Sequence, residues 1–190
     1  MIRSKKLISG LWRPKPDKTQ RCNYYRFDRN ERTSLFTDKQ FSEIVGSISP
    51  YDLVAYGELE SFYNKICNWL KVHRQNILLT SGSDTGIKAV YEAYVSKGDE
   101  VIITLPNYAM FSVYSAMFGA FEVQHFCSIN LTFNSDQLIN IINDKTRLIV
   151  ISNPGHTGKS VPEKDLFNII TAAAKFNALV LIDEAYHHFY

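Results

Sequence analysis

Hydrophobic positions in this chain follow two periods, which alternate from about Leu53 onward. Short runs in which nearly every residue is apolar predict buried strands, and longer segments with apolar residues at helical spacing predict helices. The predicted strands are 77–80, 100–105, 121–126, 147–152 and 179–183. The predicted helices in the same region are 57–72, 83–96, 108–118, 134–142 and 163–176.

This alternation of strands and helices predicts an α/β fold. Near-continuous apolar strands indicate a mostly parallel sheet that is covered by helices on both faces. Pro106 ends one predicted strand and Gly119 ends one predicted helix. In open sheets of this kind, ligands bind beyond the carboxyl ends of the strands, so residues that directly follow a strand are the first candidates for function.

The N-terminal segment differs from the rest, because it is rich in charge, proline and aromatic residues and has weak periodicity. We interpret it as an irregular arm with one short helix over 37–45. The predicted organisation is therefore an arm over 1–47 and one α/β domain over 48–190.

Composition is that of an ordinary globular protein, since 45% of the 190 residues are hydrophobic and 21% are charged. The formal net charge is +2, and the basic residues are scattered along the chain. A nucleic-acid-binding face requires clustered basic residues, so we expect no nucleic-acid partner.

The cysteines, Cys22, Cys67 and Cys127, are odd in number and far apart. They fit neither a disulfide framework nor a zinc site, which favours a reducing, cytoplasmic setting. The N-terminus has charges but no long apolar core, so we predict no signal peptide. No apolar run approaches the length of a membrane span, and we expect no membrane association.

The first candidate group is TSGSDTGIKAV, residues 80–90, where a predicted strand ends and a helix begins. Gly82 permits a close approach to the backbone, and free N–H groups at Ser83 and Asp84 would suit a phosphate at a helix N-terminus. The alternative is that Ser83 or Asp84 is simply a good N-cap. The segment matches neither the Walker loop nor the GxGxxG fingerprint.

Two further groups follow predicted strands. Tyr108, in LPNYAMF, stands where its ring could lie on a flat aromatic ligand, or could be a core or rim aromatic. Asp183, in LIDEAY, follows an apolar run, where a carboxylate favours a cationic partner such as a ring nitrogen. Tyr186 could then bond another polar atom of that ligand. The alternative is that Asp183 and Glu184 face solvent.

A histidine pair, His187 and His188, comes next in the sequence. No other cysteine, histidine or acid stands at a metal-ligand spacing from this pair, so we expect no metal site.

Taken in order, the motifs GSDTGI, KGDEVIITLPNYAMF, SNPGHTG and LVLIDEAYHHF resemble those of fold-type I pyridoxal-phosphate-dependent aminotransferases. The resemblance runs from about Asp28 to Tyr190 and is to the class I/II group that includes histidinol-phosphate aminotransferases. It implies that residues 48–190 are the cofactor-binding large domain of such an enzyme, truncated at its C-terminal side.

The resemblance also implies roles for individual residues toward pyridoxal 5′-phosphate. The backbone amides of Ser83 and Asp84, after Gly82, match the turn that holds the phosphate. Tyr108 matches the aromatic that stacks on the pyridine ring. Asp183 matches the acid that binds the protonated pyridine nitrogen, and Tyr186 matches the tyrosine that bonds the phenolic oxygen.

Tyr51 resembles the tyrosine that reaches the cofactor phosphate of a neighbouring subunit, which implies a homodimer when the protein is full length. Gly57 is one place off the family pattern and Glu60 replaces its arginine, so Tyr56 remains an alternative. Asn30 and Glu31 resemble a stretch of the family's N-terminal arm that lies close to substrate.

Two departures from the family pattern stand out. Gly155 occupies the register of the family asparagine that contacts the cofactor's phenolic oxygen, for which Asn153 or His156 could substitute. The Schiff-base lysine of the family lies after the DEAY motif in a Ser-Lys segment, which these 190 residues lack. Lys97 and Lys159 stand elsewhere, so we assign no catalytic residue within the chain.

The implied function is that of an aminotransferase for an amino acid or amino-acid-like donor and a keto acceptor. The chain would be its N-terminal half, inactive alone because the covalent anchor is missing. A decarboxylase or other lyase of the same fold, and a non-catalytic truncated module, remain open as alternatives.

Overall fold

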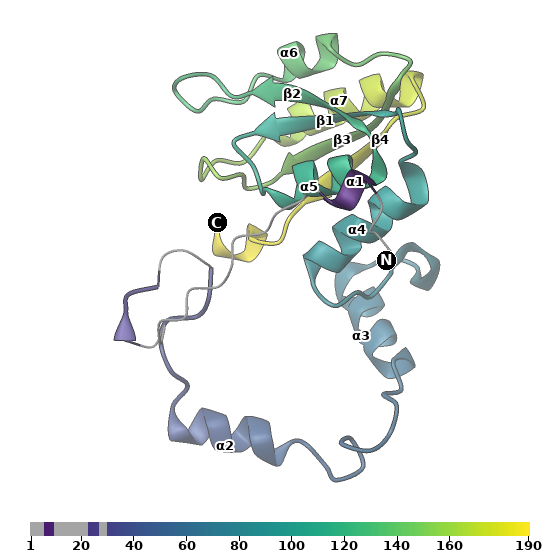
Figure 1. Cartoon of the computed structure of the whole chain (residues 1–190). Helices are drawn as coiled ribbons and strands as arrows, with labels where there is room; N and C mark the ends of the chain where they lie inside the picture. Colours follow the sequence, from purple (N-terminus) through teal and green to yellow (C-terminus); the bar gives the residue numbers. More distant parts are fainter. Residues whose placement is uncertain (1–5, 10–22, 27–29) are drawn as a thin grey trace. The chain divides into compact units, whose positions relative to one another are not determined.

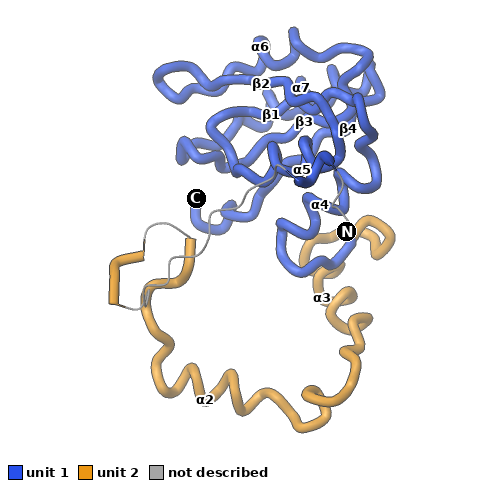
Figure 2. Tube along the Cα trace, viewed as in Figure 1, with its two compact units in different colours: residues 1–12, 78–190 blue, residues 13–77 orange. Residues whose placement is uncertain are grey.

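The structure, a computed structural model of the chain, describes residues 6–9, 23–26 and 30–190. Part of the predicted arm and Cys22 therefore lie outside the described residues. The chain divides into two compact units, residues 1–12 with 78–190 (unit 1) and residues 13–77 (unit 2), which Figure 2 colours blue and orange.

Unit 2 carries the helices predicted in the N-terminal third. In its described part these are α2 (Asp38–Gly46) and α3 (Glu60–Leu70), and a short helix that was not predicted, η2 (Arg74–Asn76), follows them. A capping box begins α2, in which Thr37 and Gln40 each bond the other's backbone N–H. The Arg74 guanidinium lies 3.2 Å from the ring centroid of Tyr63 and holds η2 against α3.

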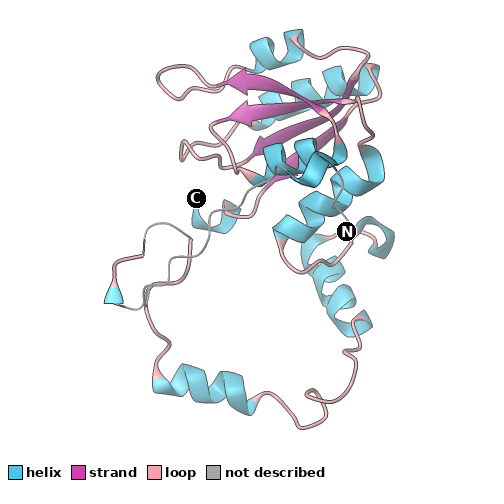
Figure 3. Cartoon of the chain, in the orientation of Figure 1, coloured by secondary structure: helices cyan, strands magenta, loops and turns pink. Residues whose placement is uncertain are grey.

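Unit 1 is built on a parallel sheet, as Figure 3 shows in magenta. Its strands are β1 (Glu100–Leu105), β2 (Phe121–Phe126), β3 (Thr146–Ser152) and β4 (Leu179–Asp183). Its helices are α1 (Lys6–Ser9), α4 (Ser83–Tyr94), α5 (Met110–Phe118), α6 (Ser135–Asn140), α7 (Glu163–Lys175) and η3 (His187–Phe189). The strand order is β2-β1-β3-β4, and each neighbouring pair is parallel, which confirms the predicted α/β class.

Helices cover both faces of this sheet because successive strand residues point to opposite sides. On one face, Ile103 and Val150 pack with residues of α4 and α5. On the other face, Ile102 and Ile149 pack with residues of α6 and α7. Figure 1 shows α4 and α5 on one side of the strands and α6 and α7 on the other. Both faces of β1 and β3 are thus buried, as their continuous apolar runs predict.

The predicted strand over 77–80 is wrong. These residues form neither strand nor helix, and the Leu78 side chain is 71% exposed. A β-strand requires a neighbour that accepts and donates its backbone hydrogen bonds, and none of the described strands pairs with this segment. Local apolar character therefore misled the prediction here.

The core on the α4/α5 face contains a buried phenol, which leads to a prediction about alkaline pH. Tyr91 is 0% exposed, and its Oη lies 3.2 Å from both the Phe111 carbonyl oxygen and Ser115 Oγ. Burial raises the pKa of Tyr91 from 10.0 to about 12. Between these values the unfolded chain binds fewer protons than the folded chain, so stability falls as pH rises.

We expect the free energy of unfolding to decrease by about 2–3 kcal/mol between pH 10 and pH 12 through this group. Urea unfolding at a series of pH values would measure this loss. Tyr91→Phe removes the titrating proton, so its stability should decline less steeply over the same window. Equal slopes for the wild-type chain and Tyr91→Phe would contradict the prediction.

Candidate functional site

The topology of the sheet marks a crevice between the carboxyl ends of β1 and β3. The chain passes from β1 outward to β2 and then returns across β1 to β3, so the connections after β1 and β3 run to opposite faces. Ligands of open α/β sheets bind at such a reversal of strand order.

Two polar side chains meet at this point. Ser152 Oγ, at the end of β3, donates to Asn107 Oδ1 at 2.5 Å. The same Asn107 oxygen accepts the backbone N–H of Tyr108 at 2.8 Å. The sequence analysis assigned no role to Asn107 or Ser152. Their positions could have indicated one, because Asn107 follows the predicted strand 100–105 and Ser152 ends the predicted strand 147–152. Together they fix the start of the β1–α5 connection against β3.

Asp183 lies beside this pair. It is paired with Ser152 across β3 and β4, and its carbonyl oxygen accepts the N–H of Asn153 at 2.8 Å. Its side chain is half-buried, and Oδ1 accepts the N–H of Ala185 at 3.1 Å. Asp183 is therefore held by the backbone turn that follows β4, whereas Glu184 is exposed.

The alternation of faces directs Asp183 toward a particular side of the sheet. Leu181 packs on the α4/α5 core and Val180 on the α6/α7 core, so Asp183 points to the α4/α5 side. Tyr108 packs against the same core, with its ring 5.9 Å from that of Phe111 in an edge-on arrangement. Tyr108 and Asp183 therefore share one face at the carboxyl edge.

The N-terminus of α4 belongs to this face as well. Gly82 is the N-cap residue, with φ of +82°, and no side chain caps the helix end. The alternative in which Ser83 or Asp84 is the N-cap is therefore wrong. A Cβ at Gly82 would meet nothing within 4 Å. The Asp84 side chain instead accepts a hydrogen bond from Tyr114 Oη of α5 at 3.0 Å.

Consequently the backbone N–H groups of the first turn of α4 are open to a ligand. Uncapped N–H groups and the helix dipole together favour a bound anion. The turn before the helix is braced locally, because Thr80 Oγ1 donates to the Gly82 carbonyl oxygen at 2.8 Å.

The other residues singled out in the sequence are exposed, belong to unit 2 or make other hydrogen bonds. Tyr186 follows β4 and is 45% exposed, and Tyr51 belongs to unit 2 and is 71% exposed. Asn153, a candidate replacement for the family asparagine, uses its Oδ1 to accept the Val161 N–H at 2.8 Å. Gly155 donates its N–H to the Lys159 carbonyl oxygen at 3.2 Å.

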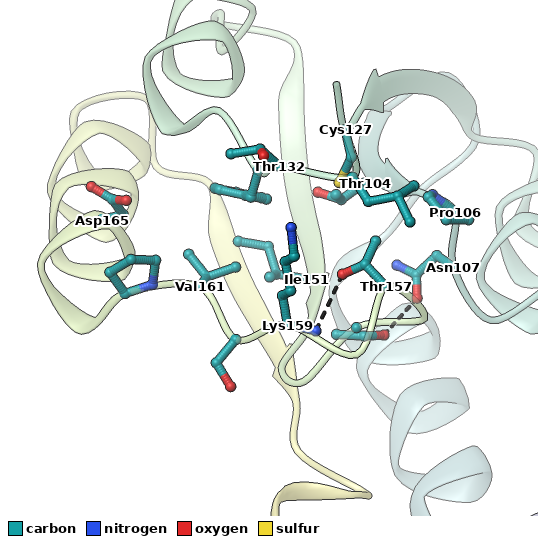
Figure 4. Close-up of a pocket in the computed structure, with 16 residues that line it drawn as sticks. Thr104, Pro106, Asn107, Cys127, Thr132, Ile151, Thr157, Lys159, Val161 and Asp165 are labelled. Carbon is teal, nitrogen blue, oxygen red and sulfur yellow. Dashed lines mark hydrogen bonds between the residues drawn. The ribbon is translucent and has the colours of Figure 1, made fainter. Parts of the chain in front are cut away.

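A cavity of about 300 Å³ opens at the same carboxyl edge, next to the α6/α7 core (Figure 4). Its lining includes Thr104, Asn107, Cys127, Ile151, Lys159 and Val161. Gly155, in the register of the family asparagine, also lines it, whereas Tyr108, Asp183 and Ser83 do not. Burial raises the pKa of the Cys127 thiol, and the nearby Lys159 charge opposes that shift.

Comparison with known proteins gives the family. A profile for aminotransferases of class I and II matches residues 22–190. The chain belongs to this aminotransferase family. A histidinol-phosphate aminotransferase of Caldanaerobacter subterraneus subsp. tengcongensis is 29% identical over 170 residues, which is 87% of this chain and 48% of that protein. The chain thus spans about half the length of the curated relatives it matches.

Solved aminotransferase structures share the fold. The aromatic aminotransferase from Pyrococcus horikoshii OT3 superposes with a TM-score of 0.72 at 24% identity, over 82% of this chain and 45% of that one. Cystalysin from Treponema denticola, whose crystal structure contains pyridoxal 5′-phosphate, superposes with a TM-score of 0.62 at 16% identity, over 77% of this chain and 38% of that one. The four-stranded parallel sheet with its helices therefore matches part of the aminotransferase fold.

Within the described residues, no group of three or more His, Cys, Asp and Glu side chains is placed to hold a metal ion. Within the same part of the chain, no helix combines the length and apolar character that crossing a bilayer requires.

Proposed function

We propose that this chain is the cofactor-binding half of a pyridoxal-phosphate-dependent aminotransferase. The observation that carries the proposal is the grouping of an uncapped helix N-terminus, an aromatic ring and a carboxylate on one face of the carboxyl edge. These are the α4 terminus at Ser83, Tyr108 and Asp183. Each has the chemistry that one part of pyridoxal 5′-phosphate requires.

The residues present fit the cofactor part by part. The open N–H groups of Ser83 and Asp84 suit a phosphate, and Gly82 leaves space for its approach. Tyr108 offers a ring for stacking on the pyridine. The Asp183 carboxylate would hold a proton on the pyridine nitrogen, and Tyr186 would bond the phenolic oxygen. When bound, the cofactor supplies an electron sink for a substrate carbanion.

Asn107 and Ser152 are the positioning residues in this arrangement. Their hydrogen bond joins the segment that carries Tyr108 to the strand that neighbours Asp183. Fixing both groups in advance lowers the ordering cost when a ring binds between them. Gly155 has no side chain that could donate a hydrogen bond, and Asn107 lines the same cavity as Gly155.

The complete protein would transfer an amino group from an amino-acid-like donor to a keto acceptor. We place the Schiff-base lysine outside these 190 residues and Tyr51 at a subunit interface of a homodimer. A decarboxylase or lyase of the same fold is the second candidate. Amine formation on the cofactor without release of carbon dioxide would favour transamination over decarboxylation.

The phosphate role of α4 can be tested with one backbone substitution. Proline is tolerated at the first position of a helix but has no N–H group, so Ser83→Pro deletes one donor with little strain. We expect Ser83→Pro to weaken binding of pyridoxal 5′-phosphate by about tenfold or more, because hydrogen bonds to charged groups contribute about 1.5–3 kcal/mol. Fluorescence titration of the chain measures this affinity.

Two controls make that experiment specific. Ser83→Ala keeps the N–H group and should bind the cofactor as the wild-type chain does. Pyridoxal, which lacks the phosphate, should bind both variants equally. Equal affinity of Ser83→Pro and Ser83→Ala for the phosphate form would contradict the proposed phosphate site. Permanent labelling of one native lysine after borohydride reduction would show that the anchor lies within the chain.

A further inference from the structure

The cavity beside the α6/α7 core is lined by a buried hydroxyl, that of Thr104, which has no hydrogen-bond partner in the described structure. Thr104 is the last residue but one of β1 and is 7% exposed. Its Oγ1 is buried and makes no hydrogen bond in the described structure. A buried hydroxyl without a partner destabilises a protein, so it indicates that another group completes the site. In Figure 4 the Thr104 side chain lies at the cavity, close to Cys127.

The ammonium group of Lys159 also borders the cavity. The Lys159 side chain extends across the cavity toward Thr104 and Thr132 (Figure 4). Its Nζ donates to the Asn130 carbonyl oxygen at 3.3 Å, which leaves further N–H groups of the ammonium for another acceptor. Because the ammonium lies near Cys127, its charge opposes the rise that burial causes in the pKa of the Cys127 thiol.

The remaining lining limits the kind of molecule that fits. Phe133, Ile151 and Val161, called here the apolar wall, line the cavity with hydrocarbon surface. Asp165 is the one carboxylate among the lining residues, and it lies across the cavity from Lys159 without an ion pair between them in the described structure (Figure 4). A volume of about 300 Å³ is at the small end of ligand cavities.

We propose that this cavity binds a small organic carboxylate, with the carboxylate at Lys159 and Thr104 and the hydrocarbon body against the apolar wall. Both polar groups are donors, and a carboxylate offers acceptors to each of them. The apolar wall packs on the α6/α7 side of the sheet and Tyr108 on the α4/α5 side, while Asn107 and Ser152 line the cavity at the edge between them. The test below uses no cofactor, so this proposal and the aminotransferase proposal can fail separately.

The test uses isovalerate as the probe and isovaleramide as its neutral isostere. Titration of the isotope-labelled chain, followed by backbone amide resonances, reports both affinity and location. We expect saturable shifts confined to residues 104–107, 127–133 and 151–165, with a dissociation constant of about 1–10 mM. The amide should bind about tenfold more weakly, because it lacks the charge that Lys159 attracts.

Three variants assign the effect to individual groups. Lys159→Gln should weaken isovalerate binding about tenfold, whereas the charge-matched control Lys164→Gln, on the exposed surface of α7, should not change it. Thr104→Val should weaken binding about threefold without lowering the thermal midpoint of the free chain, since the lost hydroxyl has no partner. Unsaturated shifts, equal binding of acid and amide, or unchanged affinity in Lys159→Gln would overturn the proposal.

Discussion

If the protein has the aminotransferase function proposed above, replacing Asp183 with asparagine is expected to reduce its turnover by about 100- to 1,000-fold. The neutral amide keeps an oxygen that can accept the Ala185 N–H but cannot hold a proton on a pyridine nitrogen. The ring would then be a poorer electron sink while the surrounding fold is preserved. Steady-state kinetics with a series of amino donors measures the loss.

The neighbouring carboxylate provides the matched control. Glu184→Gln removes the same charge at an exposed position, so its turnover should stay close to that of the wild-type enzyme. Asp183→Glu keeps the charge and should recover part of the activity that Asp183→Asn loses. Turnover in Asp183→Asn within twofold of wild type would contradict the role of Asp183, even if the chain binds cofactor normally.

The second large effect is on stability, through the core that supports Tyr108. Phe111 is 0% exposed, and its ring meets that of Tyr108 at 5.9 Å. We expect Phe111→Ala to lower the free energy of unfolding by about 3–5 kcal/mol, because it removes buried surface and leaves a cavity. A loss of this size is a large fraction of the stability of an ordinary domain. Denaturant unfolding followed by far-ultraviolet circular dichroism measures it.

Phe167 of α7 supplies the comparison, since its side chain is 60% exposed. Phe167→Ala should change the unfolding free energy by no more than about 1 kcal/mol. If both substitutions cost the same, Phe111 does not pack in the core as described. Phe111→Ala also removes the ring that Tyr108 contacts. We therefore expect the affinity for the cofactor to fall together with stability.

Local sequence signals were sufficient to predict most of the helices and strands of unit 1. The strands 100–105, 121–126 and 179–183 were predicted residue for residue, because apolar runs are bounded by residues such as Pro106 that end a strand. The helix starting at Ser83 was also predicted, but its N-cap is Gly82. The cap depends on the backbone conformation at that glycine, which residue preference alone does not reveal.

The strand predicted at 77–80 shows the opposite case. Its residues have suitable apolar character, but a strand exists only where a neighbour completes its hydrogen bonds. Pairing is a property of the sheet, and the described sheet ends at β2 on one side and β4 on the other.

By itself, the sequence determined the four strands of the sheet and the residues that follow them, because periodicity is a local property, although it also predicted a strand over 77–80 that does not form. It thereby identified Tyr108 and Asp183 as candidates before any fold was known. Only the tertiary structure decided the order β2-β1-β3-β4 and the bond between Asn107 and Ser152, residues separated by 45 positions. It also decided that Thr104 and Lys159 border one cavity. Such contacts join distant segments, and no local period encodes which segments become neighbours.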